Sequence, residues 1–113
     1  MKIPAEGKLL RIFIGEADQW QGQPLYEAII LLAKKEGMAG ATALKGFMGF
    51  GCKSHMHTAK ILRLSEDLPI IIEIVDSEEK INRFLPHLDD MVKEGLITME
   101  RAQVILYRAN VEK

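Results

Sequence analysis

Residues 45–58 hold most of the side chains in this chain that could do chemistry. The segment combines glycines with two lysines, two of the three histidines and the sole cysteine. Glycine-rich backbone lets N–H groups approach an anion, and lysines add positive charge. We therefore interpret the segment as a ligand-binding loop. The candidate contacts are Lys45, Gly46, Gly49, Phe50, Gly51, Lys53 and Ser54. The alternative is that the glycines only relieve backbone strain at a bend.

The same segment also contains a candidate set of metal ligands, Cys52, His55 and His57. Thiolate and imidazole groups suit zinc or copper. Side chains alternate along an extended backbone, however, so Cys52 and His55 point to opposite faces. The loop supplies no evident fourth ligand. We therefore predict no metal site and keep metal binding as an alternative to ordinary polar loop side chains.

The loop offers little for catalysis. An enzyme needs a base or nucleophile with an orienting partner, and Cys52 with His55 or His57 is the pairing that the sequence suggests. Neither aspartate nor asparagine accompanies that pair in the loop. Glu16 and Asp18 stand close together elsewhere, and we interpret them as ordinary turn residues. We predict that the protein is not an enzyme.

Composition limits the class of protein. A chain of 113 residues with 48% hydrophobic and 27% charged residues is typical of one globular domain, here residues 1–113. Fifteen basic residues against 16 acidic ones give no electrostatic reason to expect nucleic acid. The apolar run 28–33 is far shorter than the roughly 20 residues of a membrane helix, and no signal peptide is visible. We expect a cytoplasmic protein without membrane insertion.

The hydrophobic pattern predicts the elements around the loop. Alternation or continuous apolar runs predict strands at residues 8–16, 40–44, 59–64, 69–75 and 96–108, with a helix over 58–64 as an alternative. Helical spacing predicts helices at 24–36, and from Asp76 or Ser77 to Gly95. Pro86 interrupts the second helix, so we expect a kink or a two-part helix there. Ile30 and Leu31 extend the apolar surface of the first helix, which indicates deep burial or contact with another subunit.

With the interrupted stretches 59–64 and 69–75 counted as one strand, the elements follow the order β-α-β-β-α-β. This is the α+β, ferredoxin-like split βαβ arrangement, with a four-stranded antiparallel sheet and two helices on one face. The fold hosts many functions, so it does not itself identify one.

Two stretches resemble a known family. Lys45-Gly46, Gly49-Phe50-Gly51 and His57-Thr58 resemble the run that begins the T-loop of PII nitrogen-regulatory proteins. Residues 68–75 resemble the strand that follows that loop, and residues 62–69 with 73–76 are similar to short prokaryotic PII-like proteins of unassigned function. The resemblance covers roughly residues 9 to 107 of this chain.

The resemblance implies a PII-like homotrimer whose sheets face inward and whose loops lie near clefts between subunits. It implies a signalling protein that binds a small effector, for which an adenine nucleotide is the candidate, and acts through residues 45–58 on a protein partner such as a transporter. The loop lacks the tyrosine that PII proteins modify, and residues 93–98 contain one glycine where PII proteins have a glycine-rich phosphate loop. The alternatives are a metal-binding protein resembling the CutA branch and a docking module without a small ligand.

Overall fold

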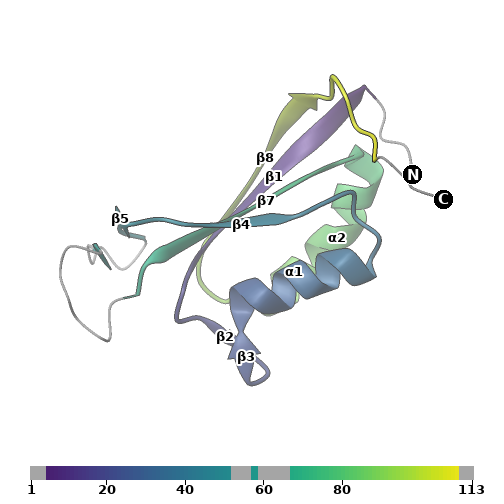
Figure 1. Ribbon diagram of the computed structural model, residues 1–113. Coiled ribbons are helices and arrows are strands. Elements are labelled where there is room, and N and C mark those ends of the chain that lie inside the picture. The colour runs from purple at the N-terminus through teal and green to yellow at the C-terminus, as the bar shows by residue number, and fades with distance from the viewer. Residues whose placement is uncertain (1–4, 52–56, 59–66, 110–113) are drawn as a thin grey trace.

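The computed structural model describes residues 5–51 and 67–109, together with the backbone of residues 57 and 58. Its helices are α1 (Leu25–Lys35) and α2 (Glu78–Met91). Its strands are β1 (Glu6–Gly15), β2 (Gln19–Trp20), β3 (Gln23–Pro24), β4 (Thr42–Lys45), β5 (Met48–Gly49), β6 (His57–Thr58), β7 (Pro69–Asp76) and β8 (Leu96–Gln103). Figure 1 shows both helices on one side of the main sheet.

The main sheet has four strands in the order β4-β7-β1-β8. Every neighbouring pair is antiparallel. The two central strands pair along almost their whole lengths, from Lys8 opposite Asp76 to Gly15 opposite Pro69. This confirms the ferredoxin-like arrangement predicted from the sequence. The short pairs β2–β3 and β5–β6 are additions that the sequence did not indicate.

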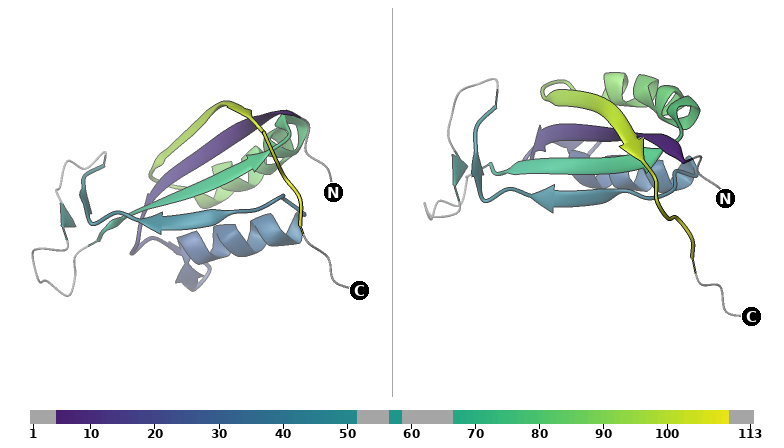
Figure 2. Two further views of the ribbon diagram at one scale, coloured as in Figure 1. Left: turned by 45° about the horizontal axis from the view of Figure 1, so that its top comes forward. Right: turned by 90° about the horizontal axis from the view of Figure 1, so that it is seen from above.

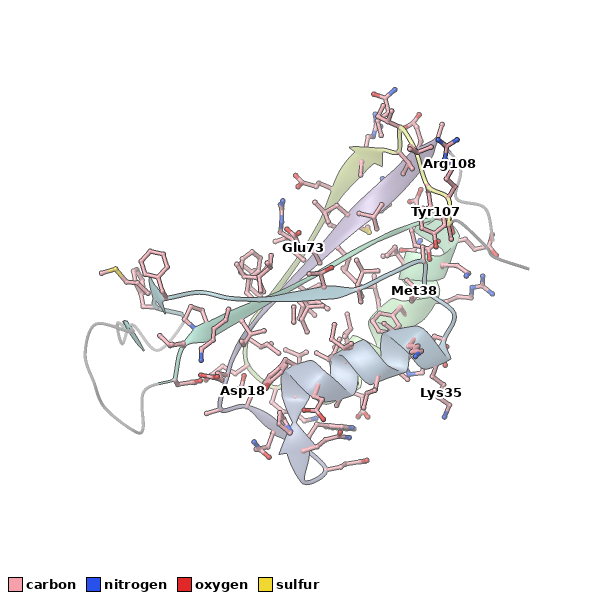
Figure 3. The ribbon with its side chains drawn as sticks, in the orientation of Figure 1. Asp18, Lys35, Met38, Glu73, Tyr107 and Arg108 are labelled. Atoms are coloured by element: carbon pink, nitrogen blue, oxygen red, sulfur yellow. The ribbon has the colours of Figure 1, made fainter. Side chains whose placement is uncertain are left out.

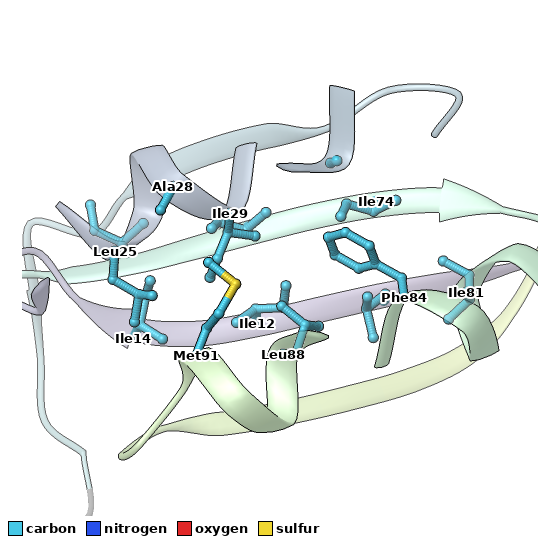
Figure 4. Close-up of a cluster of buried hydrophobic side chains, with 14 residues drawn as sticks. Ile12, Ile14, Leu25, Ala28, Ile29, Ile74, Ile81, Phe84, Leu88 and Met91 are labelled. Carbon is cyan, nitrogen blue, oxygen red and sulfur yellow. The ribbon is translucent and has the colours of Figure 1, made fainter. Parts of the chain in front are cut away.

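The core lies between the helices and one face of the sheet (Figure 4). Because strand side chains alternate, every second residue of β1 and β7 points into it. The strands contribute Leu10, Ile12, Ile14, Ile70, Ile72 and Ile74, and the helices contribute Leu25, Ala28, Ile29, Ala33, Ile81, Phe84, Leu88 and Met91. The unbroken isoleucine run thus lies in a central strand, as predicted. Its alternate residues Ile70, Ile72 and Ile74 point into this core.

The first helix follows its sequence signals. Pro24 occupies the N-cap position and Gly37 adopts a φ of +74° just beyond the C-cap. That φ lies in the left-handed region that glycine adopts without strain. Ile30 is half-buried against the core, but Leu31 is 54% exposed, so deep burial is wrong for Leu31.

The second helix begins at one of its two predicted N-caps and ends earlier than predicted. Ser77, not Asp76, is the N-cap, because its Oγ accepts a hydrogen bond from the Lys80 N–H at 3.2 Å. The helix continues through Pro86 as one element and ends at Met91, well before Gly95. The two-part alternative is therefore wrong. Neither helix in the described part of the chain is long and apolar enough to cross a membrane.

The last strand is shorter than predicted. β8 ends at Gln103, which lies opposite Glu6, the first residue of β1. Residues beyond Gln103 have no further β1 residue to pair with, so the predicted alternation up to residue 108 does not continue as a strand. Val104 instead donates its N–H to the Ala5 carbonyl at 2.6 Å, and the chain then leaves the sheet edge. The predicted strand at 59–64 lies outside the described residues.

Candidate functional site

The described part of the predicted loop forms an arm, residues 45–51, that projects beyond the main sheet (Figure 1). Its root continues the β4–β7 pairing, since the Gly46 N–H donates to the Pro69 carbonyl at 2.7 Å. A Cβ on Gly46 would lie 2.8 Å from the Pro69 ring, and one on Gly49 would lie 3.2 Å from it. Gly51 has open space around it. Gly46 and Gly49 thus allow close packing on Pro69, which favours the structural interpretation of these two glycines.

Lys45, the last residue of β4, is held at the root of the arm by an ion pair. Its Nζ lies 2.8 Å from Oε2 of Glu16, and the two side chains are 53% and 34% exposed. Glu16 is itself fixed, because its N–H donates to the Leu68 carbonyl at 2.8 Å. The pair connects the arm to the turn that follows β1.

Two more carboxylates organise that turn. Asp18 accepts the Gly15 N–H at 3.0 Å, and Asp67 accepts the Ala17 N–H at 2.7 Å. The contact with Gly15 confirms that Asp18 is a turn residue. Glu16 also pairs with Lys45, which the sequence did not indicate. Figure 3 places Asp18 beside the β2–β3 hairpin, below the root of the arm.

Three large apolar side chains of the arm are exposed. Phe47 is 71%, Met48 52% and Phe50 68% exposed. Exposed aromatic side chains gathered on a protruding segment are typical of contact surfaces. Phe50, predicted as a ligand contact, therefore presents its ring to solvent in the isolated chain.

The other predicted site residues cannot be placed. Cys52, Lys53, Ser54 and His55 lie outside the described residues, as does the side chain of His57. The ligand roles of Lys53 and Ser54 stay predictions, and so does the metal alternative. In the ranges 5–51 and 67–109, no group of three histidine, cysteine or acidic side chains is arranged to hold a metal ion.

The sheet face opposite the helices carries a charged cluster. Arg11 on β1 donates from Nε to Glu73 on β7 at 2.8 Å and from Nη1 to Glu100 on β8 at 2.7 Å. The hydrogen bond with Glu73 and the charges of both carboxylates raise the pKa of Arg11 above its ordinary value, so the guanidinium stays charged. Figure 3 shows Glu73 on this open face.

A cavity of about 590 Å³ lies on the open face, at the end of the molecule away from the arm. Its walls are residues 39–42 and 102–107, with Leu9, Glu73 and Val75 on the floor. Figure 2 shows the segment after β8 crossing the end of the sheet, and residues 104–107 of this segment line the cavity. None of the described lining residues is a lysine or arginine, so the cavity supplies apolar and hydrogen-bonding surface but no cation.

Hydrogen bonds hold the cavity wall in place. The Tyr107 hydroxyl donates to the Ala39 carbonyl at 2.9 Å, and the Ala39 N–H donates to the carboxylate of Asp76 at 2.8 Å. Asp76 is almost fully buried and also accepts the Ser77 N–H at 2.7 Å. The connection between α1 and β4 is thereby fastened to the start of α2 and to the C-terminal segment, residues 104–107.

No motif in the amino-acid sequence indicated this cavity. Residues 104–107 were predicted as strand, and Tyr107 carried no functional expectation. Asp76 was a candidate N-cap residue, and its burial, which requires hydrogen-bond donors for its carboxylate, is seen only in the structure. The sequence placed it at a helix start and did not indicate Ala39 as its partner.

Sequence comparison places the chain in a family. The profile of DUF190, described as Uncharacterized ACR, COG1993, matches residues 7–104. The chain belongs to the DUF190 family. A UPF0166 protein of Methanocaldococcus jannaschii is 42% identical over 100 residues, covering 88% of this chain and 92% of that protein. A UPF0166 protein of Aquifex aeolicus is 40% identical over 98 residues, covering 87% and 92%.

Solved structures show that this DUF190 chain has a PII-like fold. CPII from Thiomonas intermedia K12, bound to ADP and bicarbonate, superimposes with a TM-score of 0.66 at 22% identity over 88% of each chain. A second structure, of CPII with ADP, AMP and bicarbonate, gives 0.65 at 21% identity, covering 92% of this chain and 99% of that one. Its description is a nitrogen regulatory PII-like protein. The resemblance to PII-like proteins predicted from the sequence is confirmed at the level of family and fold.

Proposed function

We propose that this protein is a cytoplasmic, PII-like regulatory protein, not an enzyme, that binds an adenine nucleotide between the subunits of a homotrimer. Binding acts through residues 45–58 on a protein partner. The observation that carries the proposal is the separation of two partial sites. The cavity has about 590 Å³ of space and no described cationic lining residue, while the Lys45 arm lies at the opposite end of the sheet.

A cyclic assembly brings these two ends together. When one surface of a chain contacts a different surface of the next copy, repetition of that contact closes a ring if the rotation between copies allows it. In such a ring the arm of one subunit faces the cavity of its neighbour. The apolar cavity then receives the base, and Lys45 of the next subunit contributes charge toward the phosphates. The ADP and AMP bound to CPII support this choice of ligand.

The open face of the sheet supports the assembly. Leu44 and Leu96 are 47% and 57% exposed on or beside the face that carries Arg11. Half-exposed apolar residues around a satisfied charge cluster are suited to burial against another copy. Light scattering at micromolar concentration tests this part: we expect the mass of three chains, and a monomer contradicts it.

Titration calorimetry with ATP, ADP and AMP tests the ligand. We expect saturable binding of at least one of them by the assembled protein, with Lys45→Gln weakening it about tenfold or more, as for a lost charge-assisted contact. Glu79→Gln, on the exposed side of α2, serves as the control because Glu79 forms an exposed ion pair with Arg83 at 3.2 Å, away from Lys45. If a correctly assembled trimer gives no binding signal with any of the three nucleotides, the nucleotide proposal is wrong.

The exposed arm favours a second candidate, a docking module with no small ligand. Phe47, Met48 and Phe50 present an apolar surface without any bound nucleotide. Pull-down of partners with the wild type and with Gly49→Trp, each with and without ADP, separates the candidates. Partner loss in the variant with no effect of ADP favours the docking module; an effect of ADP on the wild type favours the regulator.

A further inference from the structure

In the isolated chain, the Lys45 ammonium already forms an ion pair with Glu16. Its 2.8 Å contact with Glu16 joins the last residue of β4 to the residue immediately after β1. The carboxylate stands on fixed backbone, because the Glu16 N–H bonds to Leu68 and the adjacent Ala17 N–H bonds to Asp67. Glu16 therefore presents a negative charge to Lys45 from a rigid turn.

This contact is also easy to exchange. Both side chains are partly exposed, and ion pairs with that exposure contribute little because water screens them. An anionic group that reaches the same ammonium has to displace Glu16 or accept repulsion from it at close range. The structure thus contains an internal competitor for any anion that uses Lys45.

We infer that Glu16 acts as this competitor: it latches the root of the arm in the empty protein, and the ligand's phosphate releases the latch by taking Lys45. The inference rests on the proposed function and adds its regulation. It connects occupancy of the site to the arm, because Lys45 is followed directly by Gly46 and the exposed residues 47–50. Release of Lys45 removes the side-chain link between the arm and the turn after β1.

Calorimetric titration of the assembled protein with ADP tests the competition. Glu16→Gln keeps the side-chain size and removes the charge, so we expect ADP to bind about two- to fivefold more tightly, the range that an exposed ion pair supplies. Glu79→Gln, which removes a carboxylate from another exposed pair, is expected to bind ADP like the wild type. In a Lys45→Gln background, Glu16→Gln is expected to change nothing, because the cycle isolates the pair.

Hydrogen exchange of the ligand-free proteins tests the latch independently. We expect amides of residues 45–51 to exchange faster in Glu16→Gln than in the wild type and Glu79→Gln, since the arm root has lost one attachment. Equal ADP affinity of Glu16→Gln and the wild type overturns the inference and leaves nucleotide binding intact. If no variant binds ADP, the proposed ligand is wrong and exchange decides the latch: faster exchange supports it, and unchanged exchange overturns it.

Discussion

The arm end and the cavity end of this molecule offer different features to a ligand. The arm end has a lysine, a glycine backbone and exposed aromatic rings. The cavity end has space and a hydrogen-bonded wall, but no lysine or arginine among its described lining residues. The cavity end therefore lacks the positive charge that Lys45 provides at the arm end. Under the proposed function, the two ends are the halves of one site, and assembly of the subunits brings them together.

The two ends also differ in how much room the packing leaves at a buried or closely packed glycine. At the cavity end, Gly7 is buried, and a Cβ there would lie 2.9 Å from the backbone oxygen of Asp76. At the arm end, a Cβ on Gly46 would meet the ring of Pro69 at 2.8 Å. Asp76 and Pro69 are the two end residues of β7, so the contacts differ in the atom that is met. A backbone oxygen within the β1–β7 pair yields less easily than the ring of a proline side chain. The losses of unfolding free energy caused by alanine at Gly7 and at Gly46 therefore measure this difference.

The largest effect is expected for Gly7→Ala. Because the central strands must separate to relieve the contact with Asp76, we expect the free energy of unfolding to fall by about 2 kcal/mol, the usual range of overpacking. Urea denaturation measures it. Gly40→Ala is the control at the same end, since nothing lies within 4 Å of a Cβ there. An equal loss in both variants contradicts the explanation by close contact.

A smaller loss is expected for Gly46→Ala at the arm. The Pro69 ring can shift, so we expect about 1 kcal/mol, again by urea denaturation. Gly51→Ala is the matched control in the same arm, because its Cβ meets open space. If Gly46→Ala lowers the free energy of unfolding as much as Gly7→Ala, the Pro69 ring is held as firmly as the backbone at Asp76, and the contrast between the ends fails.

The smallest effect is expected for Tyr107→Phe. The variant keeps the ring and removes the hydroxyl that donates to the Ala39 carbonyl, which is an exposed hydrogen bond. We expect a loss of about 0.5 kcal/mol in stability, at the low end for hydrogen bonds. Hydrogen exchange should show faster exchange in residues 104–107 and no change in residues 45–51. Faster exchange at the arm as well would show that the two ends are coupled within one chain.

Much of the fold was predictable because its signals are local. Apolar alternation identified the core residues Ile12 and Ile72, and Gly37 marked the end of α1. The end of β8 was not predictable, because it depends on where β1 begins and not on the residues after Gln103. The apolar alternation continues in the sequence after Gln103, although β1 offers no further residue to pair with.

The candidate site was predictable only in part. Lys45 and the glycines stood out by residue type, and the role of Gly46 follows from packing on Pro69, which requires the register of β4 on β7. The Glu16–Lys45 and Tyr107–Ala39 contacts join residues far apart in the chain. Neither has a sequence signal without an alignment, so both emerged from the tertiary structure.

Subunit mixing tests most directly whether the two ends form one site between copies. Lys45→Gln disables the arm, and Thr42→Trp fills the cavity that Thr42 lines. We expect each variant alone, as a trimer, to bind ADP about tenfold or more weakly than the wild type in calorimetry. After co-refolding in equal amounts, about a quarter of the sites should pair an intact arm with an intact cavity and recover wild-type affinity. No recovery in verified mixed trimers, or wild-type binding by Lys45→Gln alone, would contradict the account.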